Sequence, residues 1–211
     1  MNPKMQAYEK TAKTIIGWLN RRNMDGYYFA TSKEAVEAIL NEIPDGSKVT
    51  WAGTMSFLET GMKDALEQGD YELIDRDIAK TPAETREMYA RQVLSDYCFM
   101  STNAITLKGE LVNIDARSNR VSLLCYGPSN IILLVGMNKV VTDVESGIKR
   151  IRTQACPANC IRLNKNTPCS ITGVCGECIT DETLCNNIVI TRRSTLKGRI
   201  KVYLIGEELG F

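Results

Sequence analysis

Cysteine is the residue type through which this chain could do its most specific chemistry. Four of its eight cysteines fall in the stretch TPCSITGVCGECITDETLC, between Thr167 and Cys185. They have the spacing C-x5-C-x2-C-x6-C and are Cys169, Cys175, Cys178 and Cys185. Four thiolates match the ligand shell of a tetrahedral zinc ion or of an iron–sulfur cluster, and the spacing does not choose between them. The alternative is a metal-free, partly oxidised loop.

The remaining cysteines divide into two kinds. Cys156 and Cys160, in CPANC, stand upstream of this quartet, and they extend the metal site, supply a separate redox pair, or are buried as small apolar residues. Cys98 and Cys125 each lie inside a strand-like run, so we expect them to be buried as small apolar residues.

The absence of histidine narrows the chemistry further. It excludes a Ser-His-Asp triad, a Cys-His dyad and a histidine-ligated catalytic zinc. Any general acid or base must therefore be an Asp, Glu, Lys, Tyr or Cys side chain.

Polar residues with ligand-binding potential follow several predicted strands. Gly53, Thr54 and Ser56 stand between a strand and a helix, where free backbone N–H groups either bind an anion or are simply capped. Other polar residues stand at strand ends and turns, where α/β proteins place ligands. They are Thr102, Asn103, Glu110, Asn113, Asp115, Asn119, Arg120, Gly127, Pro128, Asn138 and Lys139. The alternative for the Asn and Asp residues is that they form the turns, and for Lys139 that it is a solvated surface lysine.

The elements that must position these residues alternate between strand and helix in the first half of the chain. Strands are predicted at 26–30, 48–53 and 71–76, and helices at 31–43, 56–66 and 81–97, with capping-box spacing at Ser56 and Thr81. Four strand-like runs follow at 98–106, 110–116, 121–127 and 131–136, with turns at 108–109 and 118–119. A helix at 143–163, which Pro157 must end or kink, precedes two closing strands. We expect one α/β domain with a mixed sheet over residues 1–211, comprising an N-terminal helical part (1–47) and a cysteine-rich insert (164–186).

Composition predicts a cytoplasmic protein that binds neither nucleic acid nor membrane. The formal net charge is +1, whereas nucleic-acid-binding domains are usually strongly basic. No apolar run reaches the roughly 20 residues of a membrane span, and the start is an amphipathic helix rather than a signal peptide. In a reducing compartment, clustered cysteines are more often metal ligands or redox groups than disulfides.

Several motifs together resemble the LUD domain, the fold of lactate utilisation protein C and its longer relatives. They are WAGTMSFLETG, TNAIT, GELVNIDARSNRVSLLCYGP, VGMNKVVTDVESGIKRIR, CPANCIRL, TPCSITGVCGEC and LIGEELGF, in the family's order. The resemblance implies a Rossmann-like sandwich of the NagB/RpiA/CoA-transferase group, with helices on both faces of the sheet. It also implies a link to the oxidation of lactate, beside partner subunits that carry iron–sulfur clusters. The thiolate quartet is a departure from lactate utilisation protein C.

The resemblance further implies a pocket for a small anionic metabolite. Carried over residue by residue, its ligand-binding positions are Gly53, Thr54, Ser56, Asn103, Asn113, Asp115, Asn119, Arg120, Gly127, Asn138 and Lys139. Glu59, Glu110, Asp115 and Lys139 are the candidates for catalysis.

Three hypotheses follow. The first is an accessory or redox subunit of organic-acid oxidation with a thiolate-held cluster or zinc. The others are a stand-alone isomerase or CoA-transferase, and a non-catalytic binding module with structural zinc. A homodimer is compatible with all three.

Overall fold

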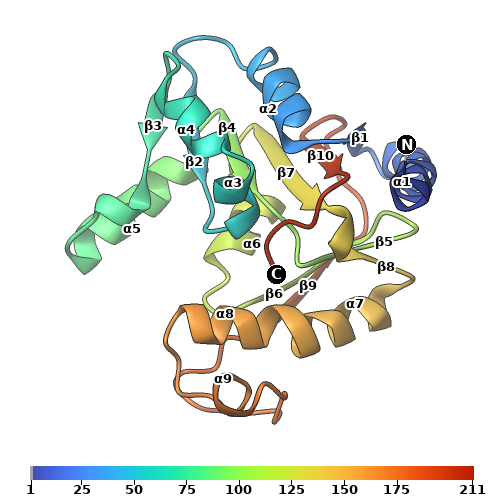
Figure 1. Ribbon diagram of the computed structural model, residues 1–211. Helices are drawn as coiled ribbons and strands as arrows, with labels where there is room; N and C mark the ends of the chain where they lie inside the picture. The colour runs from blue at the N-terminus through green and yellow to red at the C-terminus, as the bar shows by residue number, and fades with distance from the viewer. Residues whose placement is uncertain (1) are drawn as a thin grey trace.

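The computed structural model describes residues 2–211 as two sheets with helices around them (Figure 1). The strands are β1 (Asp25–Phe29), β2 (Lys48–Trp51), β3 (Glu72–Ile74), β4 (Tyr97–Met100), β5 (Ala104–Thr106), β6 (Leu111–Asp115), β7 (Asn130–Gly136), β8 (Val140–Val141), β9 (Asn187–Thr191) and β10 (Ile200–Ile205). The helices are α1 (Pro3–Arg21), α2 (Ser32–Leu40), α3 (Met55–Glu59), α4 (Met62–Glu67), α5 (Pro82–Val93), α6 (Asn119–Cys125), α7 (Val144–Arg150), α8 (Cys156–Arg162) and α9 (Pro168–Thr172). Short 3-10 turns occur at Arg76–Ile78 and Met137–Lys139, and a π-helical segment at Ile151–Ala155.

The larger sheet is six-stranded and parallel, in the order β1-β10-β7-β4-β2-β3. Its central strands are apolar on both faces because helices cover both. Ile131, Leu133 and Val135 of β7 pack in one core with α1 and α6, while Ile132 and Leu134 pack in the other with α2, α3 and α4. This arrangement confirms the predicted α/β class with helices on both faces.

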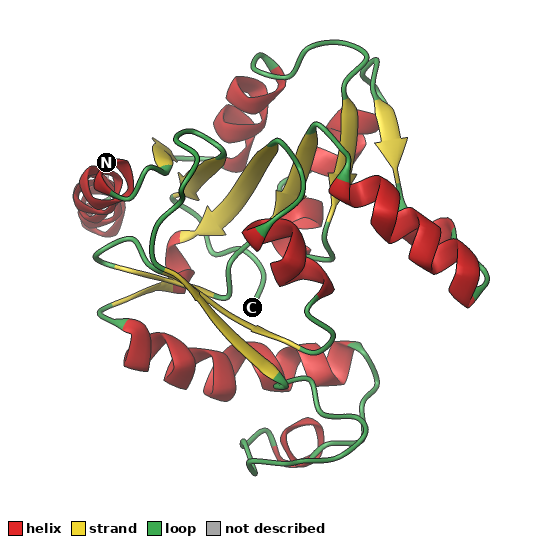
Figure 2. Cartoon of the chain, turned by 180° about the vertical axis from the view of Figure 1, so that it is seen from behind, coloured by secondary structure: helices red, strands yellow, loops and turns green. Residues whose placement is uncertain are grey.

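The smaller sheet lies across the larger one and carries a third core (Figure 2). Its order is β8-β5-β6-β9, with β5 and β9 antiparallel to β6 and β8 parallel to β5. The row of α7, the π-helical segment and α8 runs beneath this sheet, with Ile151 and Ala155 packed on Val112 and Ile114. The predicted mixed sheet is therefore two sheets, a parallel one and a mixed one.

Three local predictions are wrong. Residues 121–127 form most of helix α6 instead of a strand, because Val121 and Leu124 are buried one helical turn apart. Cys125 is consequently exposed at the end of that helix, whereas Cys98 is buried in β4 as expected. Ser56 makes no capping box, because α3 begins at Met55.

Other local predictions are confirmed. Thr31 and Thr81 both make complete capping boxes at the starts of α2 and α5. The helix expected at 143–163 is present, and it accommodates Pro157 by a π-helical segment just before α8 rather than by ending. Among the described residues, no helix is both long and apolar enough to cross a membrane.

Candidate functional site

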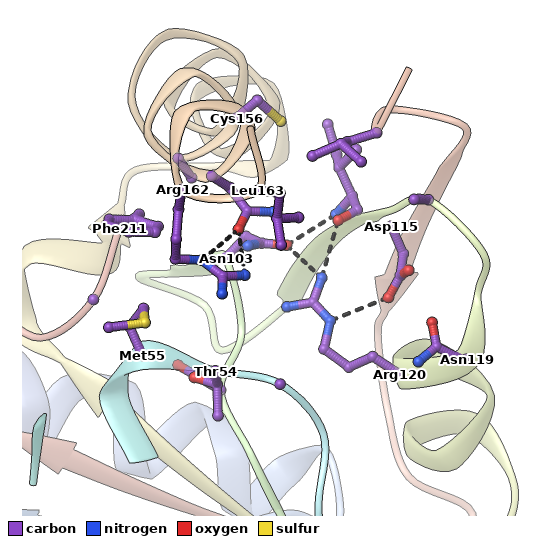
Figure 3. Close-up of a pocket in the computed structure, with 18 of the residues that line it drawn as sticks. Thr54, Met55, Asn103, Asp115, Asn119, Arg120, Cys156, Arg162, Leu163 and Phe211 are labelled. Carbon is purple, nitrogen blue, oxygen red and sulfur yellow. Dashed lines mark hydrogen bonds and ion pairs between the residues drawn. The ribbon is translucent and has the colours of Figure 1, made fainter. Parts of the chain in front are cut away.

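A cavity of about 500 Å³ lies where the carboxyl ends of the parallel strands meet the smaller sheet and α8. Figure 3 shows its walls: Thr54 and Met55 come from the start of α3, Asp115 and Arg120 from β6 and α6, and Arg162 from α8. The C-terminal segment supplies Gly210 and Phe211. The edge where strands end is where open α/β sheets bind ligands, as the sequence predicted.

Arg120 organises one wall of this cavity. Its guanidinium donates to a carboxylate oxygen of Asp115 at 3.2 Å, to the side-chain oxygen of Asn103 at 2.8 Å and to the carbonyl of Ile114 at 2.9 Å (Figure 3). Asn113 supports the arrangement, because its side-chain oxygen accepts from the backbone N–H of Asn103 at 3.3 Å. The predicted residues of this wall therefore act as one hydrogen-bonded network.

Lys139 forms the floor of the cavity and is 3% exposed. Its Nζ donates to Ser56 Oγ at 2.9 Å and to Ser101 Oγ at 3.1 Å. Burial, and then the charges of Arg150 and Arg120, lower the pKa of Lys139 to about 7.

Arg76 is a cavity residue that the motif analysis missed. Its Nη1 is buried and has no hydrogen-bond partner in the described part of the chain. A Cβ at Gly53 would stand 2.9 Å from Arg76 Nη2, so the glycine permits the close approach of the guanidinium. Its position at the end of the predicted strand 71–76 was the signal that could have found it.

The cavity is lined by more basic than acidic side chains. The acidic ones are Asp77 and Asp115; the basic ones are Arg76, Arg117, Arg120, Lys139, Arg162 and Lys165. This excess of basic side chains gives the cavity a positive electrostatic potential, which its low-dielectric walls strengthen. The cavity therefore favours a small anion.

Not every predicted site residue lies at the cavity. Glu110 pairs with Arg22 and Thr106 in the β5–β6 turn, and Gly127 forms a turn with a φ of +148°. Asn138 binds the backbone of Leu209, and Glu59 is exposed and accepts from the N–H of Gly210. Glu59 and Asn138 therefore hold the C-terminal segment against the cavity, whereas Glu110 and Gly127 have structural roles elsewhere.

A second cavity, of about 310 Å³, is lined by six thiols. They are Cys156, Cys160, Cys169, Cys175, Cys178 and Cys185. The sulfur atoms of Cys156 and Cys185 are 3.2 Å apart. A cysteine of CPANC therefore lies beside a cysteine of the quartet. As the side chains stand, no three His, Cys, Asp or Glu residues of the described chain are grouped closely enough to hold a metal ion.

The thiols of this cavity differ in how readily they ionise. The hydrogen bond from Cys156 lowers the pKa of Cys185 to about 7, and Arg152 contributes in the same direction. The same bond, together with burial, raises the pKa of Cys156. Burial likewise raises the pKa of Cys160 to about 11. Cys185 is therefore the thiol of the close pair that loses its proton first.

Comparisons with known proteins address the fold and the family. The structure resembles the crystal structure of a DUF162 family protein from Deinococcus radiodurans, with a TM-score of 0.56 and 11% sequence identity. The likeness covers 94% of this chain and 98% of that one, and at this identity it concerns the fold alone. No protein of curated function matches the chain. The family model described as LUD domain matches residues 12–205, and the chain therefore belongs to the LUD domain family.

Proposed function

We propose that this protein is an accessory or redox subunit of organic-acid oxidation, which binds a small organic anion in the basic cavity. We further propose that the thiol-lined cavity holds a zinc ion or an iron–sulfur cluster. The observation that carries the proposal is the contact between the two cavities, since Cys156 and Leu184 line both.

The anion is supported by the guanidinium groups that line the cavity. The buried Nη1 of Arg76 has no partner within the described residues, and burying an unpaired guanidinium nitrogen is costly unless a ligand completes it. Arg162 reaches toward the same space from α8 (Figure 3). A carboxylate or phosphate offers the acceptor oxygens that guanidinium groups bind best.

The donor chemistry of the thiol cavity fits a thiolate-bound metal. Six cysteines line one cavity, and Gly173 has a φ of +75°, which permits the tight turn before Cys175. The quartet Cys169, Cys175, Cys178 and Cys185 would supply the ligands, with Cys156 and Cys160 beside them. An iron–sulfur cluster would supply one-electron transfer, whereas zinc would supply a structural link.

A partner subunit is supported by apolar side chains around the thiols. Ile171, Val174 and Ile179 are 72%, 68% and 99% exposed. Apolar side chains gathered on one exposed segment mark interaction sites on soluble proteins. We infer that an iron–sulfur partner subunit in the cytoplasm covers this segment.

The anion site is tested by calorimetric titration of the protein with L-lactate, acetate and inorganic phosphate. Arg76→Gln should weaken binding about 10- to 100-fold, the equivalent of a lost hydrogen bond to a charged group. Lys33→Gln is the matched control, because Lys33 is exposed on α2, outside the cavity lining. Equal affinity of both variants and the wild type would refute the site.

The thiol site is tested on anaerobically purified protein by elemental analysis and a visible spectrum. Iron with acid-labile sulfide and broad visible absorption indicates a cluster, whereas zinc in colourless protein indicates a structural ion. Serine substitution of Cys169, Cys175, Cys178 or Cys185 should release most of the metal, and Cys125→Ser, at an exposed cysteine outside the cavity, should retain it. Full metal content in a quartet variant would contradict the assignment.

A further inference from the structure

Lys139, which lines the basic cavity, can supply a neutral amine as well as a positive charge. Lys139 is almost fully buried, and its two hydrogen-bond partners are the hydroxyls of Ser56 and Ser101, not a carboxylate. A hydroxyl can donate to a neutral amine as well as accept from a charged one. The surroundings therefore accommodate both protonation states of Lys139.

The groups around Lys139 favour its neutral form. Arg150 faces it from α7 and Arg120 from α6, while Glu59 at the end of α3 is the acidic residue that acts on it. Burial and the two guanidinium groups outweigh Glu59, and they bring the pKa of Lys139 to about 7. At neutral pH a large fraction of the amine therefore has a free electron pair, which is the state in which lysine attacks carbonyl carbon.

The C-terminal segment lies close to the amine at Gly210, and Lys139 itself lines the cavity. A Cβ at Gly210 would stand 3.1 Å from Lys139 Nζ and 2.9 Å from Ser56 Oγ, so any larger residue would crowd both groups. Lys139 and Gly210 line the same cavity as Arg76 and Arg120. A ligand whose carboxylate meets the guanidinium groups can thus direct a neighbouring carbon to the amine.

We propose that Lys139 is a nucleophile that forms an imine with a small carboxylic acid carrying an aldehyde or ketone, the simplest class being the 2-oxo acids. The inference rests on the proposed function of the cavity as an anion site, and it names the ligand class of that site. It adds a covalent step that anion binding alone does not require.

The step balances without any cofactor. The Nζ electron pair forms a bond to the carbonyl carbon, and the carbonyl π pair moves to oxygen, which takes one of the two nitrogen protons. The resulting carbinolamine loses its hydroxyl together with the second nitrogen proton as water, and the nitrogen electron pair forms the C=N bond. Ser56 and Ser101 are placed to pass these protons, since both hydroxyls contact the nitrogen.

The test is reductive trapping on the intact protein. Pyruvate or glyoxylate is added with sodium cyanoborohydride, which reduces an imine to a stable secondary amine, and the modified peptide is located by mass spectrometry. We expect the added mass on Lys139 and little on Lys165, a less buried lysine of the same cavity. Modification spread evenly over the surface lysines, or none at Lys139, would overturn the proposal.

Two controls separate this inference from the anion site itself. Propionate has the charge but no carbonyl, so it should give no adduct and should compete with the trapping by pyruvate. Lys139→Arg keeps the charge and should abolish the adduct, whereas Lys33→Arg, at an exposed position outside the cavity lining, should leave it; the peptide map of the wild type decides the matter if the first variant does not fold. Carboxylate binding without trapping refutes only the imine, and the absence of both refutes the proposed function as well.

Discussion

The buried amine of Lys139 should give the protein an unusual dependence of stability on pH. The substitution that reveals it is Lys139→Met, which keeps the length and apolar stem of the side chain but removes the titrating group. Lys139 has a pKa of about 7 in the folded chain, against an ordinary value of 10.5. This displacement corresponds to roughly 5 kcal/mol, at about 1.4 kcal/mol for each pH unit.

The direction in which stability changes with pH follows from the number of protons bound by the folded and the unfolded chain. Between pH 7 and 10.5 the unfolded chain carries a proton on this amine that the folded chain lacks. The wild type therefore gains stability relative to Lys139→Met as the pH rises through this range, by up to about 1.4 kcal/mol per unit. Below pH 7 the cost of burying the charged amine is constant and largest.

Chemical denaturation of both proteins at pH 6, 8, 9 and 10, in a buffer without small carboxylates or phosphate, measures the difference. A constant offset is expected from the two serine hydroxyls that lose their partner, so the slope against pH is the diagnostic quantity. Lys33→Met, at an exposed position, should show no slope. A pH-independent difference for Lys139→Met, or a slope of the opposite sign, would refute the reasoning.

Three further predictions concern the frame of the cavity. Gly136→Ala should lower stability by about 1–3 kcal/mol and weaken anion binding, because a Cβ there would stand 2.6 Å and 2.8 Å from backbone atoms of the C-terminal segment. Thermal unfolding measures the loss of stability, and Gly17→Ala is the control because the space around Gly17 is open. Arg120→Met should cost roughly 3 kcal/mol by leaving the buried Asp115 carboxylate unpaired, and adding Asp115→Asn should recover part of the loss in denaturant titrations. Thr81→Ala should lower stability by about 1 kcal/mol in thermal unfolding, because α5 loses its capping hydrogen bond, and unchanged stability would contradict the role of this cap.

The sequence predicted those parts of the fold that local chemistry determines. The helices expected from 31 and 81 begin there, and the predicted capping box at Thr81 is present, since a threonine followed by glutamate three residues later satisfies the free N–H groups within one turn. The run at 121–127 was misread as a strand because a short apolar stretch has no periodicity that separates strand from buried helix. Its true form depends on the packing of Leu123 and Leu124 in the core that holds the distant strands of the larger sheet.

The site was predictable where a motif placed residues after strands, and not where two distant segments meet. Asn103, Asp115 and Arg120 were predicted and do form one network. Ser56 was predicted as a ligand-binding residue, but its role as partner of Lys139 depends on the approach of segments 83 positions apart. Arg76 was not predicted from the sequence, because no motif surrounds it. Its buried Nη1 has no hydrogen-bond partner among the described residues, and this becomes evident only in the folded structure.

The pairing of the first strand with the last has a consequence for how the chain folds. Asp25 of β1 lies opposite Lys201 of β10, and β1 has no other partner strand in the sheet order. During synthesis the first strand must therefore wait until β10 has emerged from the ribosome before it can dock. Such long-range pairing is typical of slow folding, so the early segment remains open to chaperones until then. The cavity, whose walls include Gly210, is completed only after β10 has been made.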